Sequence, residues 1–263
     1  MPSHEPIASS APLLRVDRGV ATITLNRPAH RNRLEEDDLR TLLHCFEQID
    51  ADPQVRVLKL TANTHGQAKP VFCAGYHIGS FSVPDNDPQM FERVADALAA
   101  LRPITVCALN GSVYGGATDL VLACDLCVGL AGIEFRLPAT ALGLHYYPGG
   151  LRRYVARLGV SGAKRAFLTA RPFTAQMLLE MGCLEAVAAP EDLDSTVSCL
   201  VEEVAGLAPL AVQATKQSLN EIAGGQADTG MLRAREVMTA QSRDFAEGRE
   251  AFLEKRRPQF LGN

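Results

Sequence analysis

The chain alternates between two hydrophobic periodicities over its first 130 residues, and this alternation constrains its fold most strongly. Apolar residues and threonines alternate with period two over residues 20–25, which is typical of a half-buried strand. Leucines three and four apart over residues 37–49 indicate an amphipathic helix. The other predicted strands span residues 13–16, 55–60, 104–109 and 126–130, and the other predicted helices span 88–100 and 115–123. Strands that alternate with helices predict an α/β fold with crossover connections.

The pattern changes after about residue 190, where the strand-like runs stop. Helical periodicity then covers residues 192–207, 209–222, 229–245 and 247–256. We therefore predict an α/β core over residues 1–190 and a helical region over residues 191–263. This helical region is expected to pack on the core or on a neighbouring subunit.

Charge and hydropathy exclude several kinds of partner. The chain carries 26 basic and 30 acidic residues, a net charge of −4, without a run rich in Lys or Arg, so nucleic acid is not an expected partner. Apolar stretches fall short of the roughly 18 to 20 residues of a membrane helix. Residues 1–10 lack both a basic start and an apolar segment, so they do not resemble a secretory signal. These features predict a cytoplasmic protein without a membrane partner.

The seven cysteines do not indicate a disulfide framework, because their number is odd and they lie in apolar segments. Cys124 and Cys127 have the spacing of half a zinc site, but a second pair or a histidine cluster is missing. We expect core thiols here, and no metal ion.

Two glycine loops follow predicted strands and are the best candidates for chemistry. The first, residues 72–78, leaves its strand at Gly75, and the second, residues 110–119, contains Gly115 and Gly116 at the start of a helix. Glycines at such positions expose backbone N–H groups, which bind negative oxygens. The chain has neither the GxGxxG nor the GxxxxGK[ST] motif, which weakens a nucleotide-phosphate site and leaves an oxyanion site. Two structural glycine turns are the alternative.

The order of these motifs resembles the crotonase (enoyl-CoA hydratase/isomerase) superfamily. The matching segments cover nearly the whole chain and are residues 23–28 with Asn32, 72–75, 108–125, Leu137-Pro138 with Leu142-Gly143, and 245–260. The resemblance implies a crotonase-like spiral of stacked ββα units with a C-terminal helical trimerisation region. It also implies an acyl-CoA substrate and a homotrimer or dimer of trimers, with coenzyme A present as part of the substrate and no separate cofactor. The oxyanion hole would fall on the backbone amides of Tyr76 and Gly116.

The resemblance also locates the positions of two glutamates that hydratases of the family use. Asp119 aligns with the first, where a shorter carboxylate still carries a proton or else only stabilises the helix dipole. Ala139 aligns with the second, where no proton can be exchanged. An efficient hydratase of the usual design is therefore not expected.

Residues 143–150 supply other groups in place of the missing acid. His145 could serve as a general acid or base, and Tyr146 and Tyr147 can donate a hydrogen bond or a proton. Some decarboxylases of the family resemble this chain in placing a tyrosine near this point. An aromatic wall of the acyl pocket is the alternative interpretation of the three residues.

The resemblance places coenzyme A near three parts of the chain. Arg31 is the preferred phosphate contact among three arginines of residues 26–34, the others being Arg27 and Arg33. Phe252 and Lys255 match a tail that often contacts coenzyme A from a neighbouring subunit, although a basic helix end also suits the helix dipole. The substrate-binding positions of the two loops are Ala74, Gly75, Ile78 and Gly115.

These observations predict an acyl-CoA enzyme that stabilises a thioester enolate. Hydration, double-bond isomerisation and decarboxylation remain open, the last two fitting Ala139 better because neither needs an activated water molecule. A thioester hydrolase of the same fold is a further alternative, since the same hole stabilises a tetrahedral intermediate. An alternative that is not an enzyme is a non-catalytic CoA-binding protein.

Overall fold

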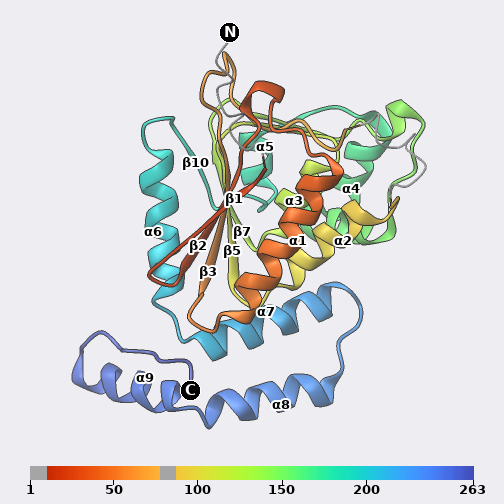
Figure 1. The fold of residues 1–263 in the computed structure, drawn as a ribbon. Helices are drawn as coiled ribbons and strands as arrows, with labels where there is room; N and C mark the ends of the chain where they lie inside the picture. The colour runs from red at the N-terminus through yellow and green to blue at the C-terminus, as the bar shows by residue number, and fades with distance from the viewer. Residues whose placement is uncertain (1–10, 78–86) are drawn as a thin grey trace.

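The computed structural model describes residues 11–77 and 87–263 (Figure 1). The predictions that concern residues 1–10 and Ile78 fall outside these ranges.

The larger of two sheets has six strands in the order β1-β2-β3-β5-β7-β10. These strands are β1 (Leu13–Asp17), β2 (Val20–Leu25), β3 (Val57–Ala62), β5 (Ile104–Leu109), β7 (Leu126–Leu130) and β10 (Ala186–Ala188). The hairpin of β1 and β2 is antiparallel, as residues 13–25 predicted, and every other pair is parallel. The interior of β5 is buried at every position, as expected of a parallel strand covered on both faces.

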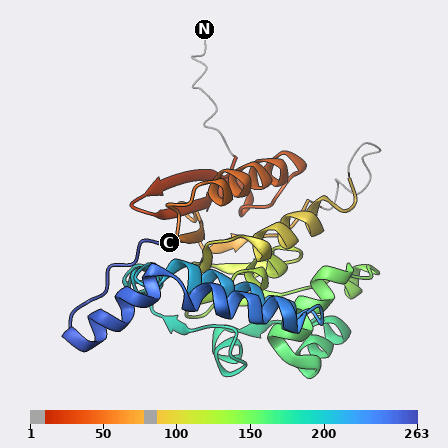
Figure 2. The same cartoon turned by 90° about the horizontal axis from the view of Figure 1, so that it is seen from below.

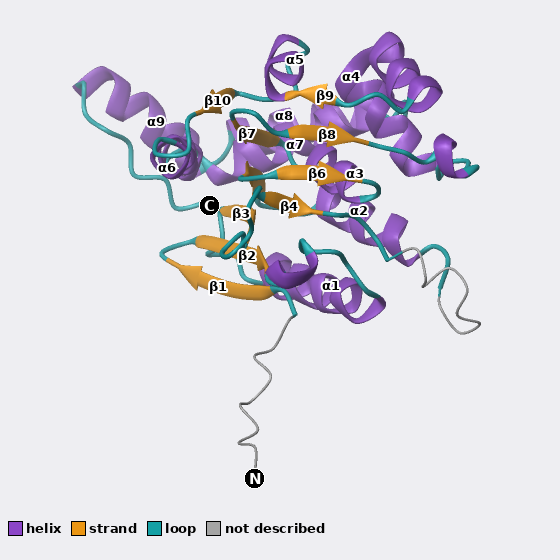
Figure 3. Cartoon of the chain, turned by 90° about the horizontal axis from the view of Figure 1, so that it is seen from above, coloured by secondary structure: helices purple, strands orange, loops and turns teal. Residues whose placement is uncertain are grey.

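The smaller sheet has four strands, in the order β4-β6-β8-β9. They are β4 (Val71–Cys73), β6 (Ser112–Tyr114), β8 (Glu134–Arg136) and β9 (Phe173–Thr174). The pairs β3/β4, β5/β6 and β7/β8 are consecutive in the chain, and each gives one strand to each sheet before the next helix begins (Figure 3). This repeated strand–strand–helix unit is the spiral that the resemblance implied, so the predicted fold class is confirmed.

Among the described residues, the helices that accompany the strands are α1 (Glu36–Ala51), α2 (Met90–Ala100), α3 (Ala117–Ala123), α4 (Pro148–Thr169) and α5 (Ala175–Glu180). A capping box holds the start of α1, where Asp38 Oδ2 accepts a hydrogen bond from the Glu35 amide. The sequence did not predict α4. It begins at Pro148, and proline suits the first helical turn.

The C-terminal helices are α6 (Leu193–Ala205), α7 (Pro209–Ala223), α8 (Thr229–Ala240) and α9 (Arg243–Glu254). Helix α6 packs on β3, β5, β7 and β10, whereas α8 and α9 lie beyond α7, away from the sheets (Figures 1 and 2). The predicted break between the last two helices was misplaced. It falls at Gln241-Ser242, because the Ser242 hydroxyl caps α9 by accepting the Phe245 amide at 3.0 Å.

Two further sequence questions are answered by burial and helix length. Cys124 and Cys127 are buried free thiols in the core, as predicted. Within the described residues, no single helix has the length and composition to cross a membrane, although α6 and α7, bent by 104° at their junction, pass that test as a pair.

Candidate functional site

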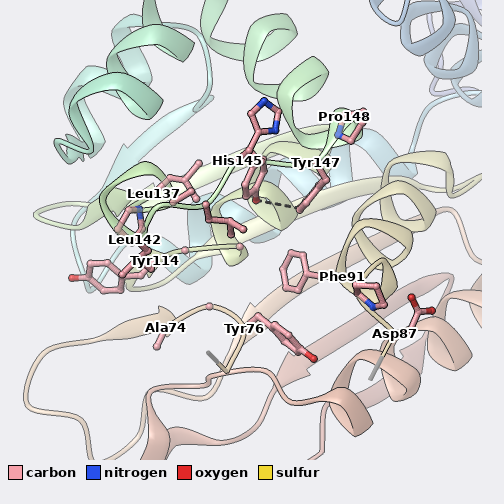
Figure 4. Close-up of a pocket in the computed structure, with 18 residues that line it drawn as sticks. Ala74, Tyr76, Asp87, Phe91, Tyr114, Leu137, Leu142, His145, Tyr147 and Pro148 are labelled. Carbon is pink, nitrogen blue, oxygen red and sulfur yellow. Dashed lines mark hydrogen bonds between the residues drawn. The ribbon is translucent and has the colours of Figure 1, made fainter. Parts of the chain in front are cut away.

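A cavity of about 510 Å³ opens where the two glycine loops, α2 and the residues before α4 come together (Figure 4). Its wall is mainly apolar and aromatic. It is lined by Ala74, Gly75, Tyr76, Asp87, Pro88, Phe91, Tyr114, Gly115, Gly116, Leu137, Pro138, Ala139, Leu142, Leu144, His145, Tyr146, Tyr147 and Pro148. The structure therefore brings together the two loops, position 139 and residues 145–147, which the sequence singled out separately.

The first loop is held by the segment before α1. The Leu34 amide donates to the Gly75 carbonyl at 2.9 Å, and the His77 amide donates to the Leu34 carbonyl at 2.9 Å. A trans peptide group directs its C=O and N–H to opposite sides. Since the Gly75 carbonyl faces Leu34, the N–H of Tyr76 is directed away from that segment.

A buried thiol strengthens the same loop. Cys73 Sγ donates to the carbonyl of Asn32 at 2.9 Å and accepts the Gly75 amide at 3.4 Å. The Ala74 amide donates to the carbonyl of Arg31 at 2.9 Å. Burial raises the pKa of Cys73 to about 12, so the thiol stays protonated and keeps donating.

The second loop is held from within α3. Gly115 adopts a φ of +57°, and its carbonyl accepts the Thr118 amide at 3.1 Å and the Thr118 hydroxyl at 2.6 Å. The same trans-peptide argument directs the Gly116 N–H away from the helix. The ring of Phe91 covers this glycine closely, because a Cβ on Gly116 would lie 2.9 Å from that ring.

The two loops touch at their glycines. Gly75 has a φ of +94°, which side chains rarely adopt, and a Cβ there would lie 2.8 Å from the Tyr114 carbonyl and 3.4 Å from the Gly116 nitrogen. Two glycines thus allow the backbones to approach within van der Waals contact. An oxyanion hole built from the Tyr76 and Gly116 amides requires this approach.

Asp119 does not lie where the sequence analysis expected an acid or base. Its side chain is fully buried and is not part of the cavity wall. Arg153 Nε and Nη2 contact the two carboxylate oxygens at 3.0 and 2.6 Å, and Tyr147 donates to Oδ2 at 2.7 Å. Both oxygens are therefore engaged, and Asp119 positions Tyr147 in this structure instead of facing a substrate.

Position 139 carries no acid but keeps its place at the site. Ala139 is buried against the cavity and precedes a short 3₁₀ turn, residues 140–142. Together with the buried Asp119, it leaves both glutamate positions of the family without a carboxylate that faces the cavity. Among the described residues of the wall the one acid is Asp87, which forms an ion pair with Arg93.

Tyr146 and Tyr147 form a stacked pair in the wall, with ring centroids 4.2 Å apart. Tyr146 donates to the Tyr147 hydroxyl at 3.1 Å, the bond drawn beside Tyr147 in Figure 4. Burial raises the pKa of both phenols, and the neighbouring Asp119 carboxylate raises that of Tyr147 further. Both phenols are therefore neutral over the physiological range.

His145 lies at the exposed rim of the cavity. Its ring is directed away from Tyr76 and Phe91 (Figure 4). The histidine is therefore less well placed than Tyr147 for contact with a molecule in the cavity. Within the described ranges, no group of three or more His, Cys, Asp and Glu side chains is placed to hold a metal ion.

The arginines before α1 divide into two kinds. Arg27 Nη2 lies 3.0 Å from Asp38 Oδ2, and Arg33 Nη2 lies 2.9 Å from Glu35 Oε1, so both bind acids at the start of α1. The charges of Arg27 and Arg33 are therefore compensated within the chain. Arg31 is exposed next to the first loop and stays the preferred phosphate contact.

Phe252 and Lys255 lie at the end of α9 and do not line the cavity of their own chain. Phe252 is 84% exposed. Their predicted role toward coenzyme A was assigned across a subunit boundary, and it stays a prediction.

Comparison with known proteins agrees with this geometry. The sequence profile described as enoyl-CoA hydratase/isomerase matches residues 15–263. The 2,3-dehydroadipyl-CoA hydratase of Escherichia coli is 32% identical over 253 residues, which span 92% of this chain and 95% of that protein. This chain belongs to the enoyl-CoA hydratase/isomerase family.

Two further relatives show the breadth of that family. The 1,2-epoxyphenylacetyl-CoA isomerase of Escherichia coli is 28% identical, over 95% of this chain and 98% of that protein. A crystal structure of an enoyl-CoA hydratase from Bacillus anthracis has a TM-score of 0.84 and 27% identity, and the match covers 96% of this chain and 99% of that chain. The family predicted from the sequence is confirmed, and the names of these relatives cover two different reactions.

Sequence reasoning missed the residues that support the family site in this chain. Arg153 was not singled out, although it neutralises Asp119 from 34 positions away. Phe91, which covers Gly116, and Thr118, which holds the Gly115 carbonyl, were also missed. A clue for Thr118 was available, since it and Asp119 are the two polar residues of the otherwise apolar helix 117–123.

Proposed function

We propose that this chain binds an acyl-CoA thioester in the cavity and stabilises its enolate, and that the reaction is the decarboxylation of a malonyl-type acyl-CoA. The observation that carries the proposal is that both glutamate positions lack a carboxylate facing the cavity, while the two glycine loops meet. Hydration and hydrolysis need a base that activates water, and isomerisation needs a base that removes a proton from a carbon atom of the acyl group. Decarboxylation needs neither.

Decarboxylation of the thioester needs no external oxidant or reductant. The bond between Cα and the carboxylate carbon breaks, CO₂ leaves, and the electron pair becomes the thioester enolate. The amides of Tyr76 and Gly116 donate to the enolate oxygen, where a pair of backbone donors contributes most as charge develops. Cα then takes a proton.

Tyr147 is the proposed source of that proton. Tyr147 lines the cavity, and a carbon-centred enolate is a far stronger base than a phenolate, so the raised pKa of the phenol does not prevent transfer. Rotation about the C–O bond turns the hydrogen from Asp119 toward the cavity. The Tyr146 hydroxyl donates a hydrogen bond to the Tyr147 oxygen, and Arg153 binds Asp119, the carboxylate beside it. Both groups stabilise the phenolate until water restores the proton.

The proposal extends to coenzyme A and to assembly. Arg31 would contact a phosphate at the first loop. The apolar side chains Phe245, Phe252 and Leu253 of α9 are 50, 84 and 79% exposed and border a groove of about 690 Å³. A second copy of the chain would cover them, as a homotrimer or dimer of trimers does, and would bring Phe252 and Lys255 toward a neighbouring site.

The test is incubation of the purified protein with malonyl-CoA, methylmalonyl-CoA, crotonyl-CoA and butyryl-CoA in D₂O, with every product identified by mass spectrometry. Loss of CO₂ with one deuterium at Cα is the expected result for the two malonyl-type compounds. Gain of water by crotonyl-CoA, deuterium exchange in butyryl-CoA or release of free CoA would instead establish hydration, base-driven enolisation or hydrolysis. Binding without any change in mass would establish a non-catalytic CoA-binding protein.

Tyr147→Phe separates the two halves of the mechanism. It should slow turnover roughly a hundredfold, the lower range for loss of a general acid, while the binding of acetyl-CoA stays within about twofold. Unchanged turnover would exclude Tyr147 as the proton source and direct attention to water at the rim.

A further inference from the structure

Two buried hydroxyls stand in series behind the second glycine loop. The Thr118 hydroxyl oxygen lies 2.6 Å from the Gly115 carbonyl oxygen and 2.5 Å from the Tyr154 hydroxyl oxygen. A hydroxyl has a single hydrogen, and Thr118 needs it to reach a carbonyl, which can only accept. Tyr154 is therefore the donor to Thr118, and the bonds run in one direction from Tyr154 through Thr118 to Gly115.

This series is closed to solvent. Thr118 and Tyr154 are both fully buried, and neither belongs to the cavity wall. Tyr154 packs against the rings of Phe135, Tyr146 and Phe167 at centroid distances of 6.3, 6.0 and 4.8 Å. Water cannot replace either hydroxyl, so the loss of one leaves its partner without a bond. Burial also raises the pKa of Tyr154, which keeps the phenol a donor.

The receiving carbonyl belongs to the peptide group whose N–H is that of Gly116. This carbonyl accepts two hydrogen bonds, one from the Thr118 amide at 3.1 Å and one from the Thr118 hydroxyl. Hydrogen bonds to a peptide oxygen polarise the whole group, which makes the N–H at its other end a stronger donor. They also fix the plane of the peptide, and so the direction of that N–H.

We propose that Tyr154 and Thr118 form a hydroxyl relay that fixes the orientation and the donor strength of the Gly116 amide in the oxyanion hole. Both are positioning residues, since neither touches the cavity. The inference rests on the proposed oxyanion hole but not on decarboxylation, because any reaction that charges the thioester oxygen would use it. The Thr118 step reaches the amide through one peptide group, and the Tyr154 step acts only through Thr118.

A purely structural role for these residues makes different predictions. A core hydroxyl pair would affect the free energy of unfolding alone. A relay also changes the polarisation of a bound thioester carbonyl, which can be measured without turnover. The variants are Tyr154→Phe, Thr118→Val, Thr118→Ser and the double variant Tyr154→Phe/Thr118→Val, with Thr61→Val as a matched control on β3, where the threonine hydroxyl lies 3.5 Å from the Ala108 carbonyl.

The first readout is the infrared stretching frequency of acetyl-CoA labelled with ¹³C at its carbonyl and bound to each variant. The wild-type protein should lower this frequency relative to free acetyl-CoA. Thr118→Val should remove a large part of that shift, Tyr154→Phe a smaller part, and Thr118→Ser and Thr61→Val almost none. The double variant should match Thr118→Val, because two members of one series are not additive.

The second readout is the turnover of malonyl-CoA, where kcat should fall roughly tenfold in Thr118→Val and roughly threefold in Tyr154→Phe, well below the hundredfold or more for a lost oxyanion donor. KM should stay within about twofold, since most of the binding energy of the ground state comes from contacts outside the oxyanion hole.

Carbonyl frequencies that match wild type in both Thr118→Val and Tyr154→Phe would overturn the relay, as would a double variant with the summed effect of the two single variants. If bound acetyl-CoA shows no shift in the wild-type protein, the oxyanion hole and the relay both fail. If the shift behaves as expected while malonyl-CoA is unchanged, the relay holds and decarboxylation alone is wrong.

Discussion

Arg153 donates two hydrogen bonds to Asp119, from Nε to Oδ1 at 3.0 Å and from Nη2 to Oδ2 at 2.6 Å. The same guanidinium also forms an ion pair with Asp96, whose side chain is half exposed, whereas that of Asp119 is fully buried. One cation thus joins a buried and a solvated carboxylate. Substituting each carboxylate in turn therefore measures how much the buried ion pair of Arg153 with Asp119 contributes to the free energy of unfolding.

Asp119→Asn should lower the free energy of unfolding by about 3 kcal/mol, because it leaves a largely buried guanidinium and a partly buried phenol without their charged acceptor. The matched control Asp96→Asn should cost less than about 1 kcal/mol, since its carboxylate is solvated. Urea unfolding followed by circular dichroism measures both. An equal loss of unfolding free energy in the two variants would mean that the buried ion pair stabilises the fold no more than the solvated one.

Ala139→Glu tests whether restoring an acid at this position restores hydration. The new carboxylate would enter an apolar cavity wall, where a second negative charge disfavours a malonyl-type substrate. We expect KM for malonyl-CoA to rise roughly tenfold, equivalent to about 1.4 kcal/mol, and crotonyl-CoA to remain unhydrated, because Arg153 still holds Asp119.

The neutral variant Ala139→Gln controls for size. It should reduce turnover through bulk alone, with less effect on KM than the glutamate has. Substantial hydration by Ala139→Glu would show that one carboxylate suffices and that Asp119 is more available than its contacts indicate.

Gly75→Ala tests the contact between the two loops. An added Cβ combines the cost of a positive φ with a distance of 2.8 Å to the Tyr114 carbonyl, so the first loop must shift. Turnover should fall roughly a hundredfold, which is typical of a misplacement near 1 Å at a reacting centre. Gly132→Ala is the control, since Gly132 has a φ of +80° but nothing within 4 Å of the added Cβ.

Gly132→Ala should therefore show only the backbone cost, about 1 to 2 kcal/mol in the free energy of unfolding, with turnover unchanged. Comparable turnover in the two variants would show that the close approach of the loops is not needed for catalysis.

The sequence was sufficient where the signal was local. Period-two alternation located β2, and the glycines at 75 and 115 marked both loops, since each adopts a positive φ at the end of a strand. Comparison with the family pattern identified Ala139 as an alanine at a glutamate position. Each of these inferences needed only a few neighbouring residues.

The sequence was insufficient where partners are distant or a helix is atypical. Arg153 meets Asp119 across 34 residues, and Tyr154 meets Thr118 across 36, distances that no periodicity encodes. Helix α4 carries four glycines and a non-helical residue at Gly159, so its propensity and amphipathic pattern are weak, and packing decides its structure.

The buried tyrosines predict a steep loss of stability in alkali. Burial raises the pKa of Tyr146, Tyr147 and Tyr154, so above pH 10 these phenols ionise in the unfolded chain but stay neutral in the folded one. Their contribution to stability is complete below about pH 10 and is lost as the pH rises toward their folded pKa values. Each such phenol removes about 1.4 kcal/mol per pH unit above that point.

Tyr146→Phe isolates one of these phenols. The variant loses a hydrogen bond to Tyr147, which lowers its stability at neutral pH by about 1 kcal/mol, but its dependence on pH should be shallower than that of the wild-type protein. Urea unfolding at several values between pH 9 and 11.5 should give slopes that differ by about 1.4 kcal/mol per pH unit at the alkaline end. Parallel curves for the two proteins would show that Tyr146 ionises equally in the folded and unfolded chains, and that the aromatic wall of the cavity is open to water.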